Sequence, residues 1–88
     1  GYFFARQLEK ELDVPIGLIG SNWGGTRIEP WIPPVGFQKV AALKPIADKL
    51  ADFPQKNDKG AINHQSALAL YNGMIHPLVP YGMRGTLW

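Results

Sequence analysis

The sequence contains no cysteine, so it can form neither a disulfide nor a thiolate metal site. Without cysteine, the redox compartment also stays undecided. Long apolar runs are missing too, because none approaches the roughly 20 residues that a membrane-spanning helix needs. No basic segment followed by an apolar stretch opens the chain, and no signal peptide is visible.

An excess of charge of one sign is absent as well. Nine Lys and Arg residues stand against seven Asp and Glu residues in 88, a formal net charge of +2. This charge is too small and too scattered to indicate nucleic acid or a membrane as a partner. A chain of this length buries only about 60–65% of its unfolded surface, so its own core would be marginal. The abrupt aromatic start after Gly1 and the strand-like ending at residues 85–88 favour an interior part of a longer protein.

The first part of the chain predicts a helix followed by a strand. Apolar residues from Phe4 to Leu12 repeat at helical spacing, which predicts a helix over residues 2–12 that ends ahead of Pro15. The nearly continuous apolar run over residues 14–20 is typical of a strand covered on both faces in a parallel sheet. Helix, turn and strand make half of a βαβ unit, so the predicted fold class is α/β.

The later part of the chain predicts further helices. Residues 36–53 favour two short helices, the second beginning near Pro45. Residues 54–60 have the polar composition of a connector. Over residues 67–75 a short helix competes with a turn at the Asn-Gly pair.

The end of the chain is expected to be extended. Pro77 and Pro80 indicate an extended stretch, and residues 86–88, after a glycine, predict the start of the next strand. The sequence has no internal repeat and no low-complexity tract.

The loop over residues 21–31 has the strongest chemical signal. It follows the predicted strand, which is where ligands bind in open α/β sheets. Its adjacent glycines, Gly24 and Gly25, permit backbone conformations closed to other residues. Such a loop can turn N–H groups toward a crevice as an oxyanion hole or a phosphate nest, with a plain structural turn as the alternative. The phosphate interpretation is weaker, because no phosphate-loop motif is present.

Two tryptophans lie in the same loop. Trp23 and Trp31 are interpreted either as a packed lid or as stacking platforms for a sugar. Glu29 lies between them, and an ion pair with Arg27 or a bond that braces the loop is favoured over a role as catalytic acid.

No serine or histidine stands in a catalytic or metal-binding motif. Ser21 lies outside the G-x-S-x-G pattern and is interpreted as a turn hydroxyl, while Ser66 is expected to cap a helix. His64 and His76 lack metal-type spacing, and His76, beside Pro77, is expected to be packed and hydrogen-bonded rather than catalytic. The residues alone therefore offer no complete hydrolytic site.

Several blocks of the sequence resemble the sialate O-acetylesterase family of SGNH-type carbohydrate esterases. They read VPIGLI at 14–19, WGGT at 23–26, IEPW at 28–31, LYNGMIHPL at 70–78 and RGTLW at 84–88. The resemblance covers nearly the whole chain in the family's order. Only residues 36–66 match poorly, and we interpret them as a variable helical insertion.

The resemblance implies a fold, a reaction and a substrate class. It implies that residues 1–88 are an internal part of one three-layer α/β/α catalytic domain (the flavodoxin-like SGNH hydrolase fold) with parallel strands. The implied activity is that of a carboxylic ester hydrolase that removes acetyl groups from sugars such as sialic acid. The expected substrate is a small-molecule or oligosaccharide acetyl ester, with no cofactor, metal, nucleic acid or membrane. Enzymes of this kind are often secreted, periplasmic or lysosomal.

The resemblance also implies which residues contribute to the site. The serine nucleophile and the catalytic His would lie outside this chain. His76 matches a position beside the family's Asn-Gly-Met-Ile block and not the catalytic His. The glycine pair would contribute to the oxyanion hole through Gly24 and Gly25. The remaining expected residues bind substrate or brace the loop: Trp23, Thr26, Glu29, Trp31 and Asn72.

Overall fold

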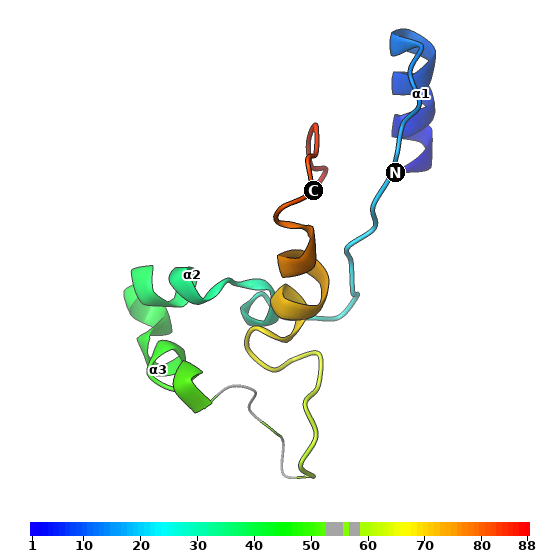
Figure 1. Ribbon diagram of the computed structural model, residues 1–88. Coiled ribbons are helices and arrows are strands. Elements are labelled where there is room, and N and C mark those ends of the chain that lie inside the picture. The colour runs from blue at the N-terminus through cyan, green and yellow to red at the C-terminus, as the bar shows by residue number, and fades with distance from the viewer. Residues whose placement is uncertain (53–55, 57–58) are drawn as a thin grey trace.

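The computed structural model describes residues 1–52, 56 and 59–88. In this part of the chain, short helices are joined by turns and extended segments, and no β-strand is formed (Figure 1). The predicted α/β class, with parallel strands in a three-layer α/β/α arrangement, is therefore wrong for the described chain.

The apolar run over residues 14–20 shows why the prediction of strands failed. Its backbone is extended, but no backbone hydrogen bond joins it to another described segment. Val14, Leu18 and Ile19 are 47%, 54% and 50% exposed, so neither face is covered. A β-strand requires a neighbour to complete its ladder of hydrogen bonds. Residues 86–88 are likewise exposed, and no backbone hydrogen bond pairs them with another described segment as a strand.

The first helix has the predicted bounds. Helix α1 spans Tyr2–Leu12 and ends at Asp13, whose φ of 50° is left-handed and whose N–H donates to the carbonyl of Glu9 at 2.9 Å. This is the αL type of helix end, and Asp tolerates it better than most residues with a side chain. The chain then turns back along α1, which projects from one end of the molecule (Figure 1).

The middle of the chain is helical in short pieces, as predicted. The pieces are η1 (Glu29–Trp31), α2 (Pro34–Lys39), η2 (Ala41–Leu43), α3 (Lys44–Ala47) and η3 (Leu50–Asp52). A proline lies in the first turn of α3, where its missing N–H costs nothing. Phe53 and most of the predicted connector, residues 53–55 and 57–58, lie outside the described residues.

The later helical segment differs from the expectation in two ways. The chain is helical only from residue 69 onward, leading directly into η4 (Tyr71–Ile75), a π-helical turn that contains the Asn-Gly pair, while Leu68 just before it has a left-handed φ of 64°. The 3₁₀ turn η5 (His76–Leu78) follows and contains Pro77 near its start, so the predicted extended stretch there is wrong. Proline fits the first turn of a helix because no intrahelical bond is lost.

The core is small and lies where the helical pieces meet. Phe37 of α2 is fully buried, Leu68 and Leu70 are nearly so, and Pro30 of η1 is buried as well. Helix α2 contacts α3, and η1 contacts η4. The radius of gyration is 16.6 Å, against about 12 Å expected for a compact domain of this length.

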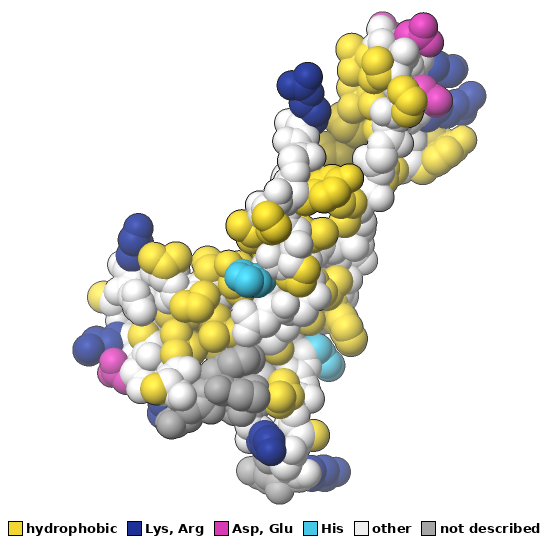
Figure 2. Space-filling view, viewed as in Figure 1, with side chains coloured by type: hydrophobic (Ala, Val, Ile, Leu, Met, Phe, Trp, Pro, Cys, Tyr) yellow, Lys and Arg dark blue, Asp and Glu magenta, His cyan; other side chains and the backbone are white. Residues whose placement is uncertain are grey.

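Much of the apolar surface stays in contact with solvent. Figure 2 shows hydrophobic side chains at the surface around α1 and over the α2 and α3 region. Among the described residues, no helix has the length and apolar character needed to cross a bilayer.

Replacing Phe37 by Ala is expected to remove the centre of the core. The cavity and the lost apolar contacts should reduce the free energy of unfolding by about 3–5 kcal/mol. Phe3→Ala is the matched control, because Phe3 is 80% exposed, and it should change that free energy by less than about 0.5 kcal/mol. Urea unfolding followed by circular dichroism measures both. Equal effects of the two substitutions would contradict the assigned core.

Candidate functional site

The glycine pair forms an exposed turn. Gly25 has a φ of 73°, and an added Cβ at Gly24 or Gly25 would meet no atom within 4 Å. The left-handed backbone at Gly25, rather than lack of space, is therefore what requires glycine there.

The two glycine amides are not used in the fold. Among the described residues, no hydrogen bond joins the N–H of Gly24 or Gly25 to another group, and both residues are exposed. Backbone N–H groups that a fold leaves open are the kind of donor that an anion or an oxyanion can accept from. The turn thus has open N–H donors, and its role in an oxyanion hole stays a prediction.

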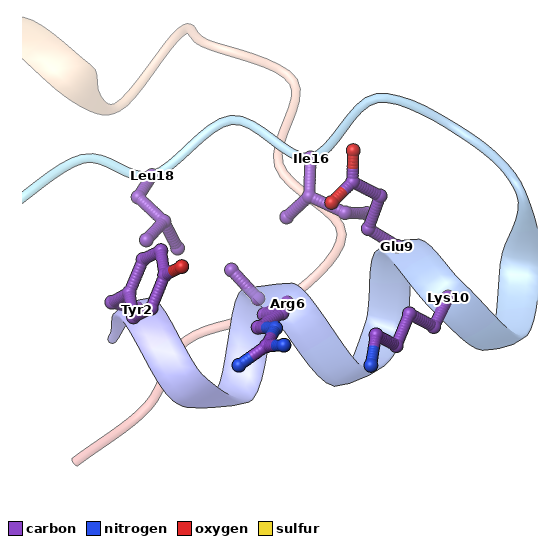
Figure 3. Close-up of a pocket in the computed structure, with 7 residues that line it drawn as sticks. Tyr2, Arg6, Glu9, Lys10, Ile16 and Leu18 are labelled. Carbon is purple, nitrogen blue, oxygen red and sulfur yellow. The ribbon is translucent and has the colours of Figure 1, made fainter.

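The turn is exposed to solvent. Two pockets on the described surface are lined by other residues. One, of about 340 Å³, lies between α1 and the extended run, with Tyr2, Arg6 and Leu18 in its wall (Figure 3). The other lies beside α2 and α3 and includes Phe37.

Two side chains brace the loop from within. The Thr26 hydroxyl donates to the carbonyl of Trp23 at 2.9 Å. The same Thr26 oxygen accepts a hydrogen bond from the indole Nε1–H of Trp31, also at 2.9 Å. Thr26 therefore links the start of the turn to η1, and Trp31, which is partly buried, packs against the loop rather than standing free.

A side chain far along the sequence holds the other edge of the loop. The Gln65 Nε2–H group donates to the carbonyl of Gly25 at 2.9 Å, and its Oε1 accepts from the backbone N–H of Arg27 at 3.1 Å. Gln65 lies 40 and 38 residues from these partners. Sequence reasoning missed Gln65, because no local pattern indicates a contact over that distance.

The neighbouring histidine makes a second contact with the loop. The His64 and Trp23 rings are stacked, with centroids 5.2 Å apart and planes inclined by 14°. Trp23 remains 51% exposed. The other histidine, His76, lies edge-on to Tyr71 at 5.8 Å, away from this stack.

The two remaining expected residues, Glu29 and Asn72, lie in η1 and η4, and among the described residues no hydrogen bond joins their side chains. Glu29 opens η1 and is partly buried, and the described structure has no ion pair between it and Arg27. Asn72 is exposed in η4, and its N–H donates to the carbonyl of Leu68 at 2.8 Å. The Ser21 hydroxyl donates to the carbonyl of Met74, 53 residues away, at 3.4 Å, so it does not bond nearby backbone as the expected turn hydroxyl would.

The described residues contain no cluster of three His, Asp or Glu side chains that could hold a metal ion.

The comparison with known proteins shows the class of protein to which this chain is similar. No protein-family model and no solved structure matches the chain. The curated sequences that match it are esterases.

The esterases that match the chain are sialate O-acetylesterases. The chain is 38% identical to the human enzyme over 87 residues and 38% identical to the Pongo abelii enzyme. It is 30% identical to the mouse enzyme over 108 residues. Each match covers 99% of this chain but only 15% of the human and 19% of the mouse protein. The chain is thus a homologue of the sialate O-acetylesterases, which confirms the resemblance found in the sequence.

Replacing Thr26 by Val is expected to free the Trp31 indole. The bond between them should slow hydrogen exchange of the Trp31 Nε1–H about fivefold relative to a free indole, as a bond of about 1 kcal/mol would. Trp88, which is fully exposed, supplies that reference in the same molecule. Thr26→Ser keeps the hydroxyl and should keep the protection. Indole exchange measured by NMR that is unchanged in Thr26→Val would contradict the bond.

Proposed function

We propose that the chain is part of a serine carbohydrate acetylesterase that removes O-acetyl groups from sugars such as sialic acid. In this proposal the turn at Gly24 and Gly25 supplies backbone donors to the oxyanion hole. Homology to sialate O-acetylesterases over 99% of the chain supports the reaction class. The observation that carries the role of the turn is the unpaired, exposed state of the two glycine amides.

Ester hydrolysis explains why such donors matter. A serine hydroxyl attacks the acetyl carbonyl while a histidine takes its proton, and the carbonyl oxygen becomes an oxyanion. Donors about 2.7–3.1 Å from that oxygen stabilise it, and losing one typically costs about 10²–10³ in rate. The proposal places the serine and the histidine outside these 88 residues.

The surroundings of the turn fit a sugar ester. Trp23 directly precedes the glycine pair and presents a half-exposed indole. One side of that ring is occupied by His64, which fixes its orientation. An exposed indole edge or face beside an anion-binding turn could contact the sugar ring while the acetyl oxygen lies against the amides.

The isolated chain is expected to hydrolyse no acetyl ester. Its glycine turn offers donors, but the described structure pairs Ser21 with a backbone carbonyl rather than a base. A chromogenic acetyl ester and an O-acetylated sialic acid are the substrates to use. Turnover that Ser21→Ala abolishes would contradict the proposed division between this chain and the nucleophile.

A chimera tests the role of the turn directly. The 87 aligned residues of the human enzyme are replaced by this chain, and hydrolysis of O-acetylated sialic acid is measured. Gly25→Ala in the chimera should lower kcat at least about 10-fold, because the left-handed φ costs a side-chain residue about 1–2 kcal/mol and a loop shift misplaces the donors.

Gly17→Ala is the matched control for that substitution. Gly17 has no left-handed φ, and an added Cβ there would meet nothing within 4 Å. It should leave kcat within about twofold of the unsubstituted chimera, because residues with a side chain can adopt its backbone conformation and it lies outside the glycine turn. Equal losses in Gly25→Ala and Gly17→Ala would count against a specific role for the turn.

A sugar-binding module is the second candidate, and the half-exposed Trp23 is the observation that favours it. Titration of the isolated chain with acetylated and unacetylated sialic acid, followed by Trp fluorescence, separates the two functions. Saturable binding of both sugars, together with an inactive chimera, would support the module. Against it, Trp31 is hydrogen-bonded into the loop, so the pair does not form one open platform.

A further inference from the structure

We propose that Gln65 is a positioning residue of the esterase, clamping the glycine turn so that its unpaired amides hold a fixed direction. The inference rests on the proposed function of that turn. The observation behind it is a single primary amide that bonds both Gly25 and Arg27, from 40 and 38 residues away.

The clamp consists of two hydrogen bonds from one side-chain amide to one backbone segment. The Gln65 amide has a donor and an acceptor on one edge, and it meets the carbonyl of Gly25 and the N–H of Arg27 together. It therefore holds the backbone on both sides of Thr26 in one arrangement, where no sheet is present to do so.

The base of the clamp is itself held in place. The backbone N–H of Gln65 donates to Oδ1 of Asn63 at 2.7 Å, which closes an Asx-type turn under the side chain. Gln65 is partly buried. The adjacent His64 ring stacks on Trp23. Residues 63–65 thus contact the loop on both sides of the glycine pair.

The direction of the amides follows from these contacts. Gly25 has the conformational freedom that the turn needs, and the same freedom would let the turn reorient. Fixing the Gly25 carbonyl fixes the far end of the turn, while the bond from Thr26 to the Trp23 carbonyl fixes its start. The N–H groups of Gly24 and Gly25 are left as the open donors between two anchored ends.

The test uses the chimera with the human sialate O-acetylesterase. Gln65→Leu keeps the size of the side chain and removes both bonds. We expect kcat to fall about 10- to 100-fold while KM changes less than about twofold, since misplaced donors weaken the transition state rather than ground-state binding. Gln38→Leu, at an exposed position of α2, is the matched control and should leave both constants unchanged.

Gln65→Glu supplies a signature that a merely structural role would not give. At neutral pH the introduced carboxylate still accepts from the Arg27 N–H but repels the Gly25 carbonyl. Once protonated, it donates to that carbonyl again and has the same shape as the native amide. The ordinary pKa of a Glu side chain is about 4.3, so the ratio of kcat for Gln65→Glu to kcat for the chimera should rise as the pH falls from about 7 to about 4.5. Titration of the catalytic groups occurs in both proteins and cancels in the ratio.

The outcomes separate this inference from the proposed function. An active chimera in which Gln65→Leu and Gln38→Leu have the same kcat, with a flat ratio for Gln65→Glu, overturns the clamp and leaves the function standing. An inactive chimera that is folded contradicts the function. In that case amide NMR of the 88-residue chain decides the clamp: shifts of the Gly25 and Arg27 amides in Gln65→Leu but not in Gln38→Leu support it, and unmoved amides overturn it.

Discussion

The loop at the glycine pair depends on side chains that take the place of a sheet. Backbone groups in an irregular segment need partners, and water or side chains must supply them when no ladder is present. Here Thr26 satisfies the carbonyl of Trp23, and Gln65 satisfies the carbonyl of Gly25 and the N–H of Arg27. The N–H groups of Gly24 and Gly25 lie between these contacts, and no described residue satisfies them.

This constraint explains which parts of the structure could be predicted. The helix over residues 2–12 was predictable because its apolar spacing and its end before Pro15 are written in neighbouring residues. The short helical pieces around Pro45 follow from equally local signals. A strand is different, since its apolar run indicates burial but does not contain the neighbour that would pair with it. The run over residues 14–20 has the composition of a strand and finds no such neighbour in the described chain.

The same limit applies to the candidate site. The sequence indicated the glycine pair, because two adjacent glycines after an apolar run are a local pattern. It could not indicate Gln65. This residue lies in the segment over 36–66 that matches the family poorly, and its contact with Gly25 spans 40 residues. The bonds of Thr26 to Trp23 and Trp31 were predictable only in part. The three residues are close in sequence, but their spacing does not indicate which group donates and which accepts.

The exposed apolar surface bears on how the chain works. Hydrophobic residues make up 45% of the sequence, yet among the described residues only a few, such as Phe37 and Leu70, are buried. Hydrophobic burial is the main favourable term in folding, so the exposed apolar side chains contribute little to stability. The relatives are much longer than this chain, which spans 15% to 20% of their lengths. In the proposed larger enzyme, exposed side chains such as Leu18 and Ile19 would pack against other parts of the protein.

Rigidity of the turn has to come from outside the turn itself. Oxyanion donors act through geometry that is fixed before the reaction, and donors that must reorganise lose most of their effect. Glycine at position 25 permits the left-handed bend but adds no stiffness, because it has no side chain to pack. A loop that needs glycine for its shape therefore needs an anchor from another segment for its precision. In the proposed enzyme, residues 63–65 would provide that anchor through the Gln65 amide and the His64 ring.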